Sequence, residues 1–264
     1  MPALSPALPV GTPVWADLAS SDLEASTAFY GAVLGWTRRD YPEFDDYADF
    51  QSNGNAMGGL APKVDEAPDA WTVYLKVDDI QAAVIAAAVA GGRVLHEPET
   101  VDGMGEWALL EDPSGAEVGV WQAGSFAGFE IVNEPGAPCW FELHTKDFAA
   151  AVPFYEKVFG WKVTSIGDSD DFRMVVFGEQ GTAGAGIFDA ARTPADPRSQ
   201  WIVYLAVADA DAAASLVTAN GGTVHDGPSD TPFGRMSHAA DSTGAAFCFI
   251  QLPDRADAPS TQEN

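Results

Sequence analysis

Two short apolar runs carry acidic and basic side chains at a spacing of two residues. In the first run Asp17 follows Trp15, and in the second Glu142 and His144 follow Trp140. If both runs are strands, each set shares one face of a sheet. A carboxylate next to an imidazole could act as a general base or orient a ligand hydroxyl, and Asp17 could serve the same way. The alternative is a hydrogen-bonded structural pair, or a strand end that faces solvent.

The tryptophans next to these groups are candidate ligand-binding residues. An indole offers a flat apolar wall and one N–H donor, which suits an aromatic or polycyclic ligand. Strand alternation predicts that Trp15 and Trp140 point into the same concavities as the acidic groups. The alternative is that each indole fills a cavity that has become part of the core.

Other candidate binding residues lie on further strand-like runs. Thr72, Tyr74 and Tyr204 are expected to line or pack the same cavities, and both tyrosines keep a hydroxyl available. Arg235 and His238 lie three positions apart on one predicted strand, so at most one of them can point inward. Arg235 could recognise an anionic or carbonyl group; the alternative is an exposed charge.

These side chains are positioned by two repeated units. Residues 14–36 return 125 positions later as residues 139–161, with nine of 23 residues identical, and residues 71–94 return 130 positions later as 201–224, with 11 of 24 identical. Each unit begins with a strand, continues with a helix capped by Asp and stopped by Gly, and leads into further strands. The pattern predicts an α+β fold of four βαβββ modules. The predicted boundaries are a lead at 1–12, a first domain at 13–123, a Gly- and Pro-rich linker at 124–137, a second domain at 138–252 and a tail at 253–264.

Composition narrows the choice of partner and compartment. The 264 residues include 13 basic and 39 acidic side chains, a formal net charge of −26. This charge would repel nucleic-acid phosphates and anionic membranes, so neither is an expected partner, and a homodimer stays open. The first 13 residues have four prolines and no Lys or Arg, and two cysteines are too few for a disulfide framework. We therefore expect a cytoplasmic protein.

The repeated units resemble a known superfamily. The stretch DLEASTAFYGAVLGW, the Gly-Gly helix stop and DPSG before a last strand resemble the vicinal oxygen chelate superfamily of glyoxalases, bleomycin-resistance proteins and extradiol dioxygenases. The resemblance covers nearly the whole chain and is greatest with two-domain glyoxalase-like proteins of actinobacteria. It implies two half-barrel domains, but the fold hosts unrelated chemistries and does not decide the activity.

The resemblance also implies where a metal would bind. Metal-using members place His, Gln or Glu seven residues before the Asp that starts each helix, and Glu or His on the last strand of a module. The corresponding residues here are Trp15, Thr72, Trp140 and Ile202, followed by Gly119, Cys248 and the surroundings of Met57 and Ala185. A divalent ion needs several converging N, O or S donors. The comparison therefore implies a lost metal site, and we expect neither a metal nor another cofactor.

Four functional hypotheses follow. The leading one is a metal-free protein that binds a small aromatic or apolar metabolite in tryptophan-lined cups and sequesters or modifies it. The second is a metal-independent isomerase, cyclase or oxygenase that uses Glu142 with His144 or Asp17 for proton transfer. The third is a metal-dependent glyoxalase-type lyase or dioxygenase. The fourth is a structural protein in which both cups are filled.

Overall fold

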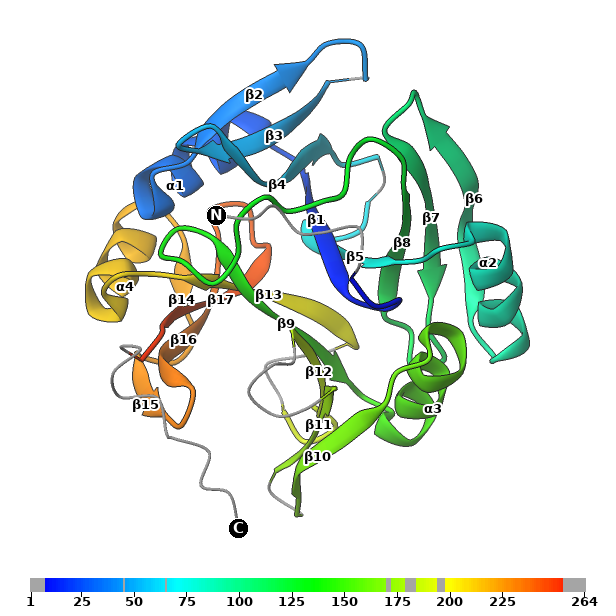
Figure 1. Cartoon of the computed structure of the whole chain (residues 1–264). Coiled ribbons are helices and arrows are strands. Elements are labelled where there is room, and N and C mark those ends of the chain that lie inside the picture. Colours follow the sequence, from blue (N-terminus) through cyan, green and yellow to red (C-terminus); the bar gives the residue numbers. More distant parts are fainter. Residues whose placement is uncertain are drawn as a thin grey trace.

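The computed structural model describes residues 8–44, 46–64, 66–169, 172–178, 184–193 and 198–253, so most of the predicted tail and part of the lead lie outside it. Over these residues the chain forms two mixed β-sheets and four helices (Figure 1). Each sheet curves into a half-barrel and contains two copies of a strand–helix–strands module. The predicted α+β fold of four βαβββ modules is confirmed.

The first sheet is built from residues 13–123. Its elements are β1 (Pro13–Ser20), α1 (Leu23–Leu34), β2 (Thr37–Tyr41), β3 (Tyr47–Ser52), β4 (Asn55–Pro62), β5 (Ala70–Lys76), α2 (Ile80–Val89), β6 (Arg93–Val101), β7 (Gly105–Glu111) and β8 (Glu117–Ala123). The strand order is β2-β3-β4-β1-β5-β8-β7-β6. The first strands of the two modules, β1 and β5, therefore pair antiparallel in the middle of one continuous sheet.

The second sheet repeats this arrangement in residues 138–251. Its elements are β9 (Pro138–Thr145), α3 (Phe148–Phe159), β10 (Val163–Asp168), β11 (Arg173–Phe177), β12 (Ala185–Asp189), β13 (Gln200–Ala206), α4 (Ala210–Ala219), β14 (Thr223–Val224), β15 (Ser229–Thr231), β16 (Gly234–Ala240) and β17 (Ala246–Gln251). β9 and β13 pair antiparallel at its centre, and both β14 and β15 pair with β16. Modules thus pair within each half of the chain.

The four helices begin where the sequence predicts. The side chains of the aspartates at positions 22, 79, 147 and 209 accept hydrogen bonds from first-turn N–H groups at 2.9–3.0 Å. α1 and α3 end at Gly35 and Gly160, whose φ values of 73° and 66° suit glycine. None of the helices in the described part of the chain is long and apolar enough to cross a membrane.

Strand register decides which side chains share a face. Trp15 lies opposite Tyr74, and Trp140 lies opposite Tyr204. The other face of each sheet packs on a helix, because the indole of Trp71 donates to the hydroxyl of Tyr30 on α1 at 3.0 Å, as Trp201 does to Tyr155 on α3 at 3.1 Å. We call the face that carries Trp15 or Trp140, turned away from the helices, the inner face of its sheet.

The helices hold the two halves together. α1 lies beside α4, and α2 beside α3 (Figure 1). A Cβ atom added at Gly92 would lie 2.7 Å from the ring of Phe154 on α3, and one at Gly222 equally close to the ring of Phe29 on α1. The second glycine of each Gly-Gly stop therefore allows the halves to approach closely, a function that the sequence analysis missed.

The segment between β8 and β9, predicted as a linker, is packed against both halves. Phe129 is 1% exposed, and its N–H donates to the carbonyl of Val14 at 2.8 Å. The N–H of Gly136 donates to the carbonyl of Ala206 in the second half at 2.7 Å. The segment is therefore anchored to both halves and contributes Phe129 to the core, despite its Gly- and Pro-rich composition.

Candidate functional site

The inner face of the second sheet carries a buried carboxylate surrounded by donors. Glu142 Oε1 lies 2.9 Å from His144 Nε2 and accepts from the Tyr204 hydroxyl at 3.0 Å, while Oε2 accepts from the Trp140 indole at 3.0 Å. Glu142 and His144 are 8% and 4% exposed. We call these four residues the Glu142 cluster. The structure thus brings together four of the predicted site residues around one carboxylate.

The donors keep this carboxylate charged. Burial acts to raise the pKa of Glu142, but the hydrogen bond and charge of His144, with the hydrogen bonds of Trp140 and Tyr204, lower that pKa below its ordinary value. An ionised carboxylate only accepts, so Nε2 of His144 carries the proton that it shares with Glu142. The geometry therefore suits Glu142 to orienting its neighbours better than to taking a proton itself.

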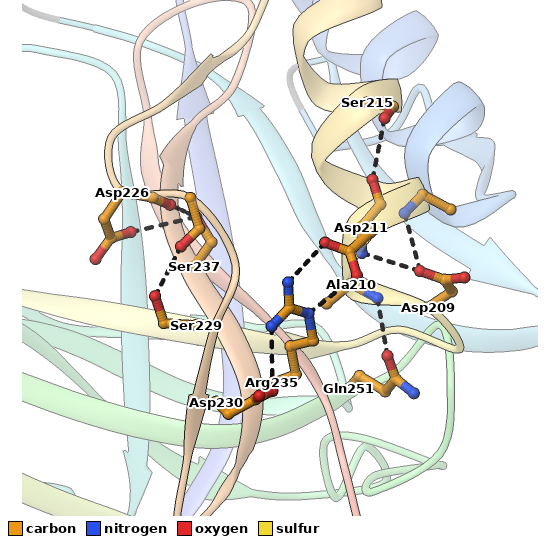
Figure 2. A network of polar contacts seen from close by, with 12 residues as sticks. Asp209, Ala210, Asp211, Ser215, Asp226, Ser229, Asp230, Arg235, Ser237 and Gln251 are labelled. Atoms are coloured by element: carbon orange, nitrogen blue, oxygen red, sulfur yellow. Dashed lines mark hydrogen bonds and ion pairs between the residues drawn. The ribbon is translucent and has the colours of Figure 1, made fainter.

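His238 joins this face from β16, whereas Arg235 does not. The ring centroid of His238 lies 5.7 Å from that of His144 and 6.2 Å from that of Tyr204. The guanidinium of Arg235 instead pairs with Asp211 at 2.8 Å and Asp230 at 3.1 Å, next to α4 (Figure 2). Of these two sequence candidates, the structure places only His238 beside the Glu142 cluster.

Apolar side chains surround the polar groups on this face. They form a cluster separate from the main core, made of Ile202, Tyr204, Cys248 and Ile250 with Cys139, Trp140, Met236, Ala246 and Leu252 packed against it. The ring of Phe188 lies 5.3 Å from that of His144. Trp140 itself is only partly buried. The inner face of the second sheet therefore carries a partly exposed indole beside an apolar wall, whose central residues Ile202, Tyr204, Cys248 and Ile250 are at most 5% exposed.

The inner face of the first sheet holds a related but different arrangement. Asp17 Oδ1 accepts from the Trp15 indole at 2.7 Å and from the hydroxyl of Tyr47 at 2.8 Å. Gly59 lies opposite, where a Cβ would come within 1.9 Å of Asp17 Oδ1. Burial raises the pKa of Asp17, and the hydrogen bonds of Tyr47, Trp15 and Tyr74 offset this only in part. The pKa of Asp17 is therefore raised, whereas the pKa of Glu142 is lowered.

Thr72 and Tyr74 complete the first inner face. Thr72 is half-buried opposite Asp17, and the hydroxyl of Tyr74 bonds to the Asp17 carboxyl. Both residues were predicted from the sequence, whereas Tyr47 on β3 was not. Alternation along residues 47–52 was the available signal, but only the strand register shows that Tyr47 reaches Asp17.

Residues of the predicted linker cover the first inner face. The Trp15 ring centroid lies 5.0 Å from that of Phe126 and 5.1 Å from that of Phe129, and Trp15 is 6% exposed. Trp15 belongs to the main core, whereas Trp140 lies outside it. Neither phenylalanine was predicted as a site residue, although two aromatic residues in a Gly- and Pro-rich segment were a signal that this segment packs.

The opposite pKa shifts predict opposite dependence of stability on pH. Because the folded-state pKa of Glu142 is lowered, its contribution is present above its ordinary value of 4.5 and is lost as pH falls through the folded-state pKa. Because that of Asp17 is raised, its contribution is present below 3.8 and is lost as pH rises through the folded-state pKa. We therefore expect wild type to lose stability relative to Glu142→Gln as pH falls, and relative to Asp17→Asn as pH rises.

Urea unfolding of the three proteins from about pH 3 to about pH 7 checks this prediction. Thermal unfolding at a single pH would be uninformative, because the expected result is a change of sign between the two slopes. The free energy of unfolding of wild type is compared with that of each variant. If both differences changed with pH in the same direction, the environment of either Glu142 or Asp17 would be described wrongly.

Comparison with known proteins gives the family. Residues 137–249 match the profile of the Glyoxalase/Bleomycin resistance protein/Dioxygenase superfamily, and residues 14–121 match the Glyoxalase-like domain. The chain is 35% identical over 251 residues to the protein named Putative glyoxylase CFP32 of Mycobacterium tuberculosis, covering 91% of this chain and 95% of that one. The chain belongs to this superfamily.

Other members and solved structures agree with this assignment. The chain described here is 34% identical over 259 residues to Anthracycline biosynthesis protein DnrV of Streptomyces peucetius, covering 92% of this chain and 94% of that one. The Mn(II)-bound glyoxalase of Novosphingobium aromaticivorans superposes with a TM-score of 0.67 at 20% identity, over 97% of this chain and 87% of that one. The 2,3-dioxygenase LapB of Pseudomonas sp. KL28 superposes with a TM-score of 0.65 at 16% identity, over 96% of this chain and 98% of that one. The predicted superfamily and its two half-barrels are confirmed.

The residues at the superfamily's metal positions do not fit a divalent ion. Trp140 occupies one of these positions and offers no ligand atom, and the nearby carboxylate of Glu142, which is not at one of them, already accepts hydrogen bonds at both oxygens. Cys248 is fully buried, and burial raises the pKa of its thiol well above the usual value, which disfavours the thiolate that would bind metal. Within the described ranges, no three His, Cys, Asp or Glu side chains are grouped to hold an ion.

Proposed function

We propose that this chain is a metal-free superfamily member that binds a small, largely apolar aromatic metabolite on the inner face of its second sheet. The observation that carries the proposal is the Glu142 cluster, where a charged, donor-saturated carboxylate fixes an accessible indole beside an apolar wall. Such a wall binds an aromatic ring, and the fixed polar groups orient it. Two reduced cysteines fit a cytoplasmic location.

Two further observations support an aromatic ligand and a single site. A relative that aligns with 92% of the chain is named for anthracycline biosynthesis, and anthracyclines are polycyclic aromatic compounds. Trp15 is covered by Phe126 and Phe129, so the first inner face has less room for a ring. We therefore propose one working site in each chain, with sequestration of the ligand as its simplest consequence.

Titration of the purified protein with polycyclic hydroxyquinones, followed by quenching of tryptophan fluorescence, tests this proposal. We expect saturable binding of one equivalent per chain, with no metal in the protein by elemental analysis. Absence of saturable binding across the panel would overturn the binding function. A stoichiometric transition metal would overturn the metal-free proposal, and chelator-sensitive turnover of methylglyoxal with glutathione would restore the lyase alternative.

A metal-independent enzyme is the second candidate, because Glu142 fixes the ring of His144 at 2.9 Å. An oriented imidazole beside a bound ring could move a proton in an isomerisation or cyclisation. Product analysis by mass spectrometry of bound compounds, with wild type and His144→Ala, separates the two candidates. Turnover that is lost in the variant while affinity is kept would favour the enzyme.

A further inference from the structure

A second imidazole–carboxylate pair lies beside the Glu142 cluster. Asp226, in the loop between β14 and β15, accepts from the backbone N–H of His238 through Oδ1 at 2.7 Å. Its Oδ2 lies 3.2 Å from Nδ1 of the same histidine. The hydroxyl of Ser237 donates to the backbone carbonyl of Asp226 (Figure 2). Asp226 therefore holds both the backbone and the ring of His238.

This arrangement fixes the tautomer of His238. Partial burial acts to raise the pKa of Asp226, but its hydrogen bonds and charge interaction with His238, together with Ser237, lower that pKa below its ordinary value. The resulting carboxylate can only accept, so Nδ1 of His238 carries a proton. In the neutral imidazole, Nε2 is then a hydrogen-bond acceptor.

The acceptor on Nε2 has no partner. The ring is 36% exposed, yet Nε2 itself is covered and forms no hydrogen bond with any described residue. The neighbouring hydroxyl of Tyr204 already donates to Glu142. A covered acceptor without a donor is unfavourable, and a ligand that supplies a donor would satisfy it.

A ligand on the inner face would meet this atom once the side chains that cover Nε2 move aside. His238 lies beside His144 and Tyr204, on the same side of the sheet as the apolar cluster. Met236 lies two residues earlier on the same face of β16, and its long unbranched side chain adapts easily to a guest. A ring packed on the apolar wall would therefore have its polar substituent next to Nε2.

We propose that His238, oriented by Asp226, accepts a hydrogen bond from a hydroxyl group on the bound ring, so that the ligands are phenols rather than their ethers. This inference rests on the proposed function and adds the substituent that the site selects. A phenol donates one strong hydrogen bond, whereas a methyl ether of the same ring has no proton to donate. The selected class is therefore hydroxylated aromatic compounds.

A matched pair of probes, 2-hydroxyanthraquinone and 2-methoxyanthraquinone, tests the inference by fluorescence titration. We expect wild type to bind the hydroxy compound about tenfold more tightly than the methoxy compound, which corresponds to one net hydrogen bond. His238→Leu should bring the two dissociation constants together, because the acceptor that distinguishes the hydroxy from the methoxy compound is gone. Asp226→Asn should reduce the preference, because the ring is no longer held in this tautomer. His225→Gln, at an exposed histidine, is the control.

The outcomes separate the inference from the function on which it rests. Binding of both probes with equal affinity, or a preference that survives in His238→Leu, would overturn the role of His238 while leaving the aromatic site intact. Failure of both probes to bind would count against the proposed function itself. If His238→Leu does not fold, as judged by thermal unfolding, Asp226→Asn tests the role of His238 instead. The measured quantity is again the ratio of the dissociation constants of the methoxy and hydroxy compounds, and an unchanged ratio would overturn the inference.

Discussion

Replacing Glu142 with alanine is expected to lower the free energy of unfolding by about 2–4 kcal/mol and to abolish binding of the aromatic ligand. Three donors, on the buried His144 and Tyr204 and on the partly buried Trp140, lose their common acceptor in this variant. Each unpaired buried donor is unfavourable, although water entering the vacated space recovers part of the loss. Urea unfolding and fluorescence titration measure the two effects.

The exposed Glu156 on α3 offers a matched control. Glu156→Ala removes the same carboxylate from a solvated surface and should change stability by less than about 0.5 kcal/mol. If Glu142→Ala were as mild as Glu156→Ala, the carboxylate could not be the centre of a buried network. If it unfolded normally and bound the ligand like wild type, the site would lie elsewhere.

Replacing Phe129 with alanine is expected to cost about 3–5 kcal/mol of stability, the range found when a buried aromatic ring is removed. The Phe129 ring packs on Trp15 and, in the second half, on Phe141, at centroid distances of 5.1 and 5.5 Å. Its loss should loosen the contact between halves and expose Trp15, which a red shift of tryptophan emission would report. Binding on the second inner face should remain.

Phe233→Ala serves as the comparison, because Phe233 is 49% exposed and should cost much less. Equal effects of the two substitutions would contradict the packing of the linker segment. Complete loss of ligand binding in a folded Phe129→Ala protein would contradict the assignment of the site to the second sheet.

Much of the fold could be predicted because its signals are local. Asp22 caps α1 through a hydrogen bond within one turn, and Gly35 ends the helix by a left-handed backbone, so neither depends on distant residues. The repeat then carries these signals to the other modules. The packing of Gly92 against Phe154 depends on contacts between the halves, and nothing in the Gly-Gly pattern distinguishes it from a simple helix stop.

The site was predictable only along single strands. Spacing two placed Glu142, His144 and Trp140 together correctly as neighbours on β9. The contributions of Tyr47 to Asp17 and of Asp226 to His238 come from other strands or loops, and their geometry follows from register and loop conformation. Neither the strand register nor the loop conformation can be predicted from the spacing of residues in the sequence.

The two halves illustrate how identical residues acquire different environments. Trp15 and Trp140 occupy equivalent positions of the repeat, yet the linker packs on the first and leaves the second partly exposed. The acidic neighbour differs as well, because the pKa of Asp17 is raised by burial and that of Glu142 is lowered by its donors despite burial. The duplicated scaffold therefore has one inner face packed by the linker segment and one, less covered, on which we propose that the ligand binds.

The most direct test of this account is the stoichiometry of 2-hydroxyanthraquinone binding, measured by isothermal titration calorimetry for wild type, Trp140→Ala and Trp15→Phe. The account predicts one equivalent per wild-type chain, affinity at least about tenfold weaker in Trp140→Ala, and little change in Trp15→Phe. Two equivalents per chain, or a Trp140→Ala variant that binds as tightly as wild type, would contradict it.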